Sequence, residues 1–451
     1  MGRSTINATP IAIPAAIIAN DSTTTIAIVL PGTVGIECPS IHRAGEDADT
    51  VKRGDHMFRN LRSAISNFEQ RCANPSSGIS GRVFGISQTM AGEITPEFGE
   101  VREEEQLDWA KLITYLRDKL PDTDRPLTVQ QFHGGHSNLT YLLRFGDREW
   151  VVRRPPFGPL PAGGHDMGRE YRVLSRVWQA FKPAPRGMVY CEDPSIIGAP
   201  FFVMERRKGI LIRMRQPLPP ELPQDPASLR KLSEGFVDTL ADLHAVDYQA
   251  VGLGDLGKPE GFLKRQITGW MGRWEKAKTR ELPLMEKLGA WYLENMPVSP
   301  APALIHNDYY LHNLMIDFAD PGKIVGVFDW EMSTIGDPLV DFGIALGYWR
   351  EPDDPPDLLA TSEGSPHTVH PGFMSREELI HRYATRTGRD VSNMPFYWSW
   401  AHWKTATVVE QIYVRYVRGQ TTDPRFKNMG TQPPALASAA ARIARRLGFK
   451  D

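Results

Sequence analysis

The chain has 451 residues, 41% of them hydrophobic and 24% charged, and a formal net charge of −2. This near-neutral balance argues against a nucleic-acid-binding protein, and no apolar run reaches the roughly 18 residues that a membrane span needs. The three cysteines are far apart and form no CxxC pair, so the sequence carries no disulfide framework and no cysteine zinc site, and it fits a cytoplasmic protein.

Residues 1–89 differ in composition from the rest of the chain. Ser, Thr, Ala, Ile and Pro dominate, and only three charged residues precede Arg43. We expect a disordered N-terminal extension without a chemical role, and a true start near Met90.

The first folded elements are a helix and three strands. Apolar residues recur at helical spacing over 103–120, and Pro121 ends that pattern. Runs at 127–132, 139–145 and 150–153 predict strands, with a hairpin turn at 146–148.

A glycine-rich segment separates the first two strands. Glycines there let backbone N–H groups approach phosphates closely, whereas an ordinary glycine hairpin is the alternative. The segment predicted to bind the nucleotide phosphates consists of Gly134, Gly135, His136, Ser137 and Asn138.

Arg153 ends the third strand, where a protein kinase places the Lys that pairs with the phosphates. Arg can bind phosphate in a bidentate manner. The following helix, 166–181, carries Glu170, which we expect to form an ion pair with Arg153. A surface glutamate beside Arg169 and Arg172 is the alternative.

Helices dominate the next part of the chain. Periodic segments at 227–246, 262–279 and 284–295 predict three of them. His244 lies in the first, and we interpret it as a satisfied core residue.

The stretch from Ile305 to Trp330 carries the predicted chemistry. Asp308 is followed by Asn313 five residues later, the spacing of the protein-kinase catalytic loop, and an apolar run then leads to Asp329. We expect Asp308 to be the catalytic base for an acceptor hydroxyl, with His306 as a structural residue.

The motifs HNDYYLHN, FDWE and GDPLVDFG resemble those of the aminoglycoside/choline kinase-like phosphotransferases. They look closest to the kinase-like domains that occur alone in bacteria or fused to acyl-CoA dehydrogenases. The resemblance covers 127–447. It implies an α+β, protein-kinase-like fold with two lobes, a small antiparallel-sheet lobe with one helix and a larger helical lobe.

The resemblance also implies the cofactors and the domain organisation. ATP and Mg²⁺ would be the cofactors, with Asn313 and Asp329 as metal ligands and the hinge residues Glu205 and Arg206 at the adenine edge. The ATP-binding lobe with its leading helix would span 90–208. The helical lobe with the catalytic loop and the acceptor site would span 209–451.

Four further positions bear on the catalytic loop. The family commonly has Gly where this chain has Asn307; Gly tolerates a positive φ, and Asn does so better than most residues. Glu331 either assists the metal or faces solvent, and it would share the strand face of Asp329 if that strand continued. Asp337 is expected to cap a helix, and Asp341 to brace the catalytic loop.

The acceptor is expected to be a small molecule. Only seven residues separate Asp329 from Asp337, too few for the activation segment of a protein kinase. Residues 395–451 contain nine Lys and Arg but three acids, with many aromatic residues. This composition favours an anionic or amphipathic alcohol, such as a hydroxy acid or a hydroxyacyl-CoA, unless the basic residues simply coat a surface helix.

The sequence therefore predicts an ATP- and Mg²⁺-dependent phosphotransferase acting on a small-molecule hydroxyl. The expected partner is this acceptor, without nucleic acid, membrane or an obligate protein partner. The alternatives are an aminoglycoside-type antibiotic kinase and a nucleotide-binding pseudokinase without turnover.

Overall fold

The structure, a computed structural model, describes residues 17–20, 23–26, 97–132, 138–158, 166–214, 216–421 and 424–451. The chain divides into two compact units, Met1–Ile86 and Ser87–Asp451. In the first unit, strands β1 (Ile17–Asn20) and β2 (Thr23–Ile26) pair in antiparallel fashion. The remainder of the predicted N-terminal extension lies outside the described residues.

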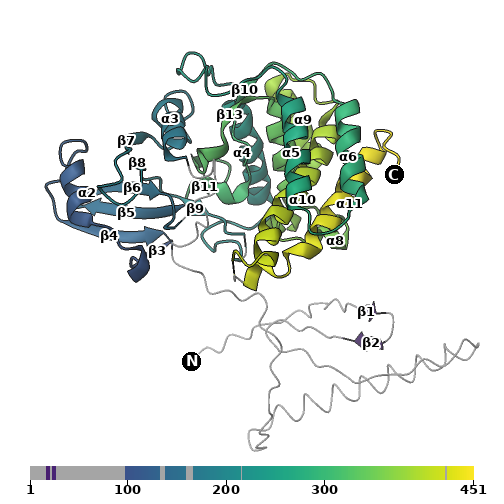
Figure 1. Ribbon diagram of the computed structural model, residues 1–451, viewed down its shortest axis with the longest axis horizontal. Helices are drawn as coiled ribbons and strands as arrows, with labels where there is room; N and C mark the ends of the chain where they lie inside the picture. Colours follow the sequence, from purple (N-terminus) through teal and green to yellow (C-terminus); the bar gives the residue numbers. More distant parts are fainter. Residues whose placement is uncertain are drawn as a thin grey trace, which may run out of the picture. The chain divides into compact units, whose positions relative to one another are not determined.

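A six-stranded antiparallel sheet forms the small lobe of the second unit (Figure 1). Its strand order is β3-β4-β5-β6-β8-β7, and the predicted hairpin turn joins β5 to β6, with Gly146 at φ 58°. The strands are β3 (Phe98–Gly99), β4 (Leu127–Phe132), β5 (Leu139–Phe145), β6 (Arg148–Arg154), β7 (Gly187–Cys191) and β8 (Phe201–Glu205).

Helices cover both faces of this sheet. Side chains alternate between the faces along a strand. Val152 and Val203 therefore join the apolar cluster that contains residues of α2 (Trp109–Leu116), whereas Val151 and Phe202 join the cluster that contains residues of α3 (Met167–Val177). The leading helix thus becomes a structural part of the small lobe.

The leading helix is shorter than the predicted 103–120. The side chain of Asp108 accepts a hydrogen bond from the Lys111 N–H at 3.0 Å and caps the helix at that point. Residues Glu103–Glu105 instead form a separate 3₁₀ turn. The apolar spacing extended across this break, so the periodicity alone overestimated the helix.

The large lobe is mainly helical (Figure 1). Its longest helix, α10, is buried along most of its length and packs against α5, α7 and α11. None of the described helices is long and apolar enough to cross a membrane. The helices are α4 (Pro226–His244), α5 (Phe262–Ala277), α6 (Pro283–Glu294), α7 (Pro338–Tyr348), α8 (Pro356–Leu359), α9 (Arg376–Thr387), α10 (Met394–Val417) and α11 (Gln432–Arg445).

Short strand pairs bring the predicted catalytic segments together. One pair joins β10 to β13, and a second group has the order β12-β11-β9. The loop after β10 and the turn after β12 thereby meet beside the start of α7, which Asp337 caps as predicted. The strands are β9 (Ile210–Leu211), β10 (Ala303–Ile305), β11 (Leu314–Ile316), β12 (Ile324–Val327) and β13 (Thr334–Gly336).

Candidate active site

Asp341 of α7 holds the main chain that leads into the catalytic loop. Its carboxylate accepts hydrogen bonds from the backbone N–H groups of His306, at 2.6 Å, and of Asn307, at 2.7 Å. It also lies 3.1 Å from Nε2 of His244, whose Nδ1 lies 2.7 Å from the Tyr383 hydroxyl. The expectations that Asp341 braces the loop and that His244 is a satisfied core residue are both confirmed.

Asn307 adopts the positive φ expected of the position where the family has Gly. Its φ is 66°, and its side chain donates to the Met332 carbonyl at 2.9 Å. Asn is one of the few residues that tolerate this conformation. The loop therefore keeps its turn, and Asp308 follows directly after it.

Asp308 and Asn313, five residues apart in the loop, contact each other. Nδ2 of Asn313 donates to the Asp308 carbonyl at 2.9 Å and to its carboxylate at 3.1 Å. The Tyr348 hydroxyl lies 3.5 Å from the other carboxylate oxygen. Burial, with the charge of Asp329, raises the pKa of Asp308 to about 7, although Lys404 and Asn313 act in the opposite direction.

Asp329 follows two residues after β12 and has an unusual conformation. Its φ is 69°, and residues Trp330–Met332 follow as a 3₁₀ turn. The strand does not continue to Glu331, so the condition for a strand face shared with Asp329 is not met. Glu331 instead accepts a hydrogen bond from Nδ2 of Asn138 at 3.3 Å.

Arg153 of β6 lies between two carboxylates. Its Nε is 3.0 Å from Glu170 of α3, and its Nη2 is 2.5 Å from Asp329. The predicted pair with Glu170 is therefore present, and Asp329 completes a link between the two lobes. Burial disfavours the charge of Arg153, but Glu170, Asp329 and Glu331 together raise its pKa above the usual value.

The glycine-rich segment is only partly described. Gly134, Gly135, His136 and Ser137 lie outside the described residues, so their predicted role at the phosphates stays a prediction. Asn138 is described, and its contact with Glu331 links the end of this segment to the turn after Asp329.

The hinge residues Glu205 and Arg206 have fewer groups free to bind adenine than the resemblance implied. The Glu205 N–H already donates to the Arg186 carbonyl at 2.9 Å. The guanidinium of Arg206 lies 2.6 Å from Glu97 and faces the ring of Phe132. Contact with adenine through this segment stays a prediction, and it would have to use other main-chain groups.

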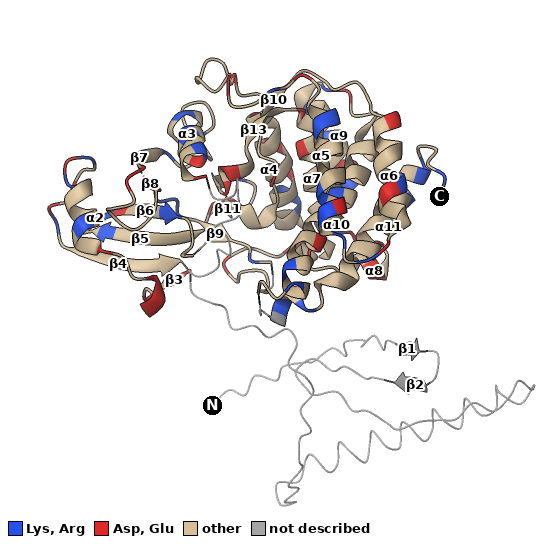
Figure 2. Cartoon of the chain, in the orientation of Figure 1, with Lys and Arg blue, Asp and Glu red and all other residues tan. Residues whose placement is uncertain are grey.

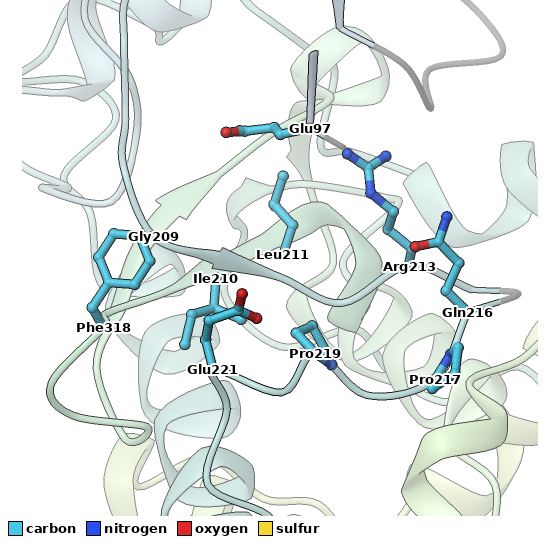
Figure 3. A pocket seen from close by; sticks show the side chains of 10 residues that line it. All are labelled: Glu97, Gly209, Ile210, Leu211, Arg213, Gln216, Pro217, Pro219, Glu221 and Phe318. Atoms are coloured by element: carbon cyan, nitrogen blue, oxygen red, sulfur yellow. The ribbon is translucent and has the colours of Figure 1, made fainter. Parts of the chain in front are cut away.

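A small cavity of about 230 Å³ lies beside the hinge (Figure 3). It is smaller than the pockets of about 300–1,000 Å³ that typically hold whole ligands, and none of the predicted site residues lines it. Its lining consists of Glu97, Gly209, Ile210, Leu211, Arg213, Gln216, Pro217, Pro219, Glu221 and Phe318.

Two side chains could hold a metal ion with the help of phosphates. No group of three or more His, Cys, Asp and Glu suited to a metal occurs within the described ranges. Mg²⁺ usually takes only one or two protein ligands and completes its shell with water and phosphate oxygens. Asn313 uses its Nδ2 to hold Asp308, which leaves its oxygen for a metal, and Asp329 supplies a carboxylate. The residues present thus fit a nucleotide-bound Mg²⁺.

Sequence reasoning missed two residues beside Asp308. Tyr348 lies near its carboxylate, and Lys404 of α10 lies 3.5 Å from the Asn307 carbonyl. In the sequence, Lys404 is only one of the nine basic residues of the C-terminal segment. Its position directly after Trp403, as the only charged residue between Pro395 and Val409, was the signal that could have identified it.

The fold and this arrangement define a kinase-like phosphotransferase. Residues 128–371 match the model of the phosphotransferase enzyme family. Since this match covers more than half of the chain, the protein belongs to that family.

The similar proteins support the predicted branch of the family. Acyl-CoA dehydrogenase family member 11 from Rattus norvegicus is 31% identical over 366 residues, and that from Gallus gallus is 30% identical over 370 residues. The matches cover 79% of this chain but 46% of each relative, so the chain spans about half the length of these relatives. A Ralstonia eutropha protein assigned to the aminoglycoside phosphotransferases is 29% identical, with a TM-score of 0.65, and the match covers 76% of this chain and 99% of that structure.

Proposed function

We propose that the protein transfers the γ-phosphoryl group of ATP to a hydroxyl group of a small molecule. The observation that carries the proposal is the convergence of the Asp308–Asn313 pair with the cluster of Arg153, Glu170 and Asp329. These are the parts that phosphoryl transfer requires: a group for the acceptor proton, groups for the metal and a cation for the phosphates.

Each residue has a distinct role in this proposal. The acceptor oxygen bonds to the γ-phosphorus, its proton passes to Asp308, and the bond to the departing ADP breaks. Asn313 and Asp329 would hold Mg²⁺, which neutralises phosphate charge when it is bound. Arg153 pairs with the phosphates while Glu170 orients its guanidinium. Burial beside Asp329 raises the pKa of Asp308, which makes its carboxylate a stronger proton acceptor.

The short connection after Asp329 supports a small acceptor. The 3₁₀ turn Trp330–Met332, the single residue Ser333 and strand β13 lead directly to Asp337, which caps α7. This interval holds neither the activation loop nor the peptide-docking segment of a protein kinase. We propose a hydroxy acid or a hydroxyacyl-CoA as the acceptor, because the similar chains are parts of proteins named as acyl-CoA dehydrogenases.

An antibiotic kinase is the second candidate. The Ralstonia eutropha structure, assigned to the aminoglycoside phosphotransferases, favours it. The surplus of basic residues in 395–451 argued against it, but seven of those nine residues are exposed on the surface. That argument is therefore weaker than the sequence suggested. Action in the cytoplasm, without a membrane or an obligate protein partner, stays a prediction.

A panel of acceptors tests the proposal. Transfer of ³²P from γ-labelled ATP would be measured with hydroxy acids, hydroxyacyl-CoAs, choline-like alcohols and aminoglycosides, with and without Mg²⁺. We expect a phosphorylated product with one class, and none with the matched compound that lacks the hydroxyl. Tight ATP binding without transfer to any acceptor would instead favour the pseudokinase.

A further inference from the structure

Lys404 differs from the other basic residues of the C-terminal segment. Of the nine Lys and Arg in 395–451, seven are exposed and Arg442 is half-buried, whereas Lys404 is only 9% exposed. Figure 2 shows basic residues distributed along the helices of the large lobe. Lys404 is the member of this set that lies inside the lobe, where α10 passes the catalytic loop.

The ammonium group of Lys404 has few partners for a buried charge. An ammonium carries three donors, but the hydrogen bond it makes is a single long one of 3.5 Å to the Asn307 carbonyl. No carboxylate oxygen of the described residues lies within 4.0 Å of Nζ. Burying a charge with unused donors is costly, so a ligand oxygen placed there would be bound favourably.

The surroundings of Lys404 suit an acyl group. Its Nζ lies 5.5 Å from the ring of Trp270 in α5, and the guanidinium of Arg273 lies 4.3 Å from the same ring. Beside Asp308, the rings of Tyr310 and Tyr348 are 4.7 Å apart. An acceptor that reaches from Asp308 to Lys404 would therefore have the two tyrosine rings beside its hydroxyl and Trp270 near its acyl oxygen.

We propose that Lys404 is a specificity-determining residue that donates a hydrogen bond to an acyl oxygen of the acceptor, a few bonds from the hydroxyl that is phosphorylated. This inference rests on the proposed function and adds the feature by which the acceptor is selected. The acyl oxygen belongs either to the carboxylate of a free hydroxy acid or to the carbonyl of its CoA thioester.

Two further observations agree with this role. Lys404 contacts the residue directly before Asp308, so a ligand oxygen on Nζ would lie close to the catalytic base. Burial lowers the pKa of Lys404 to about 8 although Asp308 and Asp341 favour its charged form. The protein therefore compensates the charge of Lys404 only in part, and an acyl oxygen on Nζ would stabilise it further.

The test compares three acceptors of matched chain length: 3-hydroxyoctanoate, 3-hydroxyoctanoyl-CoA and 3-octanol, which lacks the acyl oxygen. For the wild type we expect kcat/KM with the acid or the thioester to exceed that with 3-octanol by roughly tenfold or more. Lys404→Met should remove most of this preference by weakening the acyl-bearing acceptor alone. Whichever of the two acyl compounds loses more in the variant identifies the source of the oxygen.

Lys276→Met is the matched control, because Lys276 lies on α5 but is exposed. It should keep the wild-type preference. If Lys404 only supports the loop, Lys404→Met would slow all three acceptors equally, and the inference would be wrong. A wild type without preference for the acyl group would overturn it as well, even if the variant failed to fold.

Binding measurements separate this inference from the proposed function. The affinity of each compound would be measured by calorimetry in the presence of Mg²⁺ and a non-hydrolysable ATP analogue. Binding that favours the acyl group and depends on Lys404, without any turnover, would support the inference and contradict the proposed kinase. Turnover with neither an acyl preference nor acyl-selective binding would contradict the inference alone.

Discussion

At the scale of single residues, the site depends on side chains that satisfy two partners at once. Arg153 contacts Glu170 with its Nε and Asp329 with its Nη2, so a single planar group links the small lobe to the turn after β12. A guanidinium has this forked geometry, whereas the ammonium of Lys is a point charge on a flexible stem. The exchange of one basic residue for the other is therefore not conservative here.

We predict that Arg153→Lys weakens the use of ATP. Loss of one charge-assisted hydrogen bond typically costs about 1.5–3 kcal/mol, so kcat/KM for ATP should fall roughly 10- to 100-fold. The measurement is steady-state kinetics with ATP as the varied substrate. Arg148→Lys, an exposed position on the same strand, should behave like the wild type. Equal kinetics of the two variants would contradict this role of Arg153.

The sequence revealed the site residues whose spacing is local. Asp308 and Asn313 belong to one loop, and the pair of Arg153 and Glu170 was expected from a strand and the helix that follows it. Tyr348 reaches Asp308, and Lys404 reaches the Asn307 carbonyl, only because α7 and α10 pack beside the loop. Such contacts depend on how the helices pack together. The periodicity of a sequence shows which face of a helix is buried, but it does not show which residue of another segment that face will contact.

At the scale of elements, α7 and α10 approach each other closely because α7 presents glycine at the crossing. A Cβ added to Gly343 would lie 2.8 Å from the backbone carbon and oxygen of Tyr397 in α10. Neither helix backbone can move to make room without shifting the elements that pack against it. Since α7 carries Asp341 and α10 carries Lys404, this crossing sets the positions of both side chains.

We predict that Gly343→Ala destabilises the protein by about 1–3 kcal/mol, because it overpacks two helix backbones. The control is Gly269→Ala in α5, where an added Cβ meets nothing within 4 Å. Ala favours a helix over Gly, so this control should be neutral or stabilising by up to about 1 kcal/mol. Urea denaturation checks both variants, and a Gly343→Ala protein as stable as the control would contradict the close crossing.

His402 of α10 makes the stability of the folded protein depend on pH. Burial, with the charges of Arg350, Arg376 and Arg442, holds the pKa of His402 well below its usual value. The unfolded chain therefore binds a proton near pH 6.5 that the folded protein does not bind. The resulting stability is complete above pH 6.5 and is lost as the pH falls below that value.

We predict that the wild type loses about 1.4 kcal/mol of stability per pH unit below pH 6.5 relative to His402→Gln. The measurement is the difference in free energy of unfolding between the two proteins at pH 7.5 and at pH 5. The comparison cancels the contributions of the other titrating groups. A constant difference across this range would show that His402 does not titrate on unfolding.

The sequence predicted the long elements better than the short ones. Helices α4 to α6 end within a few residues of their predicted bounds, because each carries several turns of periodic apolar residues. The pairs formed by β9 to β13 are too short for any periodicity to be recognised, although they position the catalytic segments. These short strands form because segments that are distant in the sequence pair with each other.

At the scale of the whole molecule, the second unit contains all the residues assigned to the site. Ser87–Asp451 includes both lobes, their apolar clusters and the link from Arg153 to Asp329. We predict that a protein lacking residues 1–86 keeps the phosphotransfer rate of the full chain within about twofold, since no proposed role lies outside this unit. Side-by-side assays with the best acceptor check this, and a loss of activity in a folded truncated protein would assign a role to the first unit.

The central claim is that Asp308 takes the acceptor proton in phosphoryl transfer from ATP. The most direct measurement is the rate of ³²P transfer from ATP to the best acceptor by the wild type, by Asp308→Asn and by Asp118→Asn, an exposed control on the small lobe. We predict that Asp308→Asn loses activity by about 10²-fold or more while it still binds ATP, and that the control is unchanged. An Asp308→Asn protein that transfers phosphate at the wild-type rate would contradict the account.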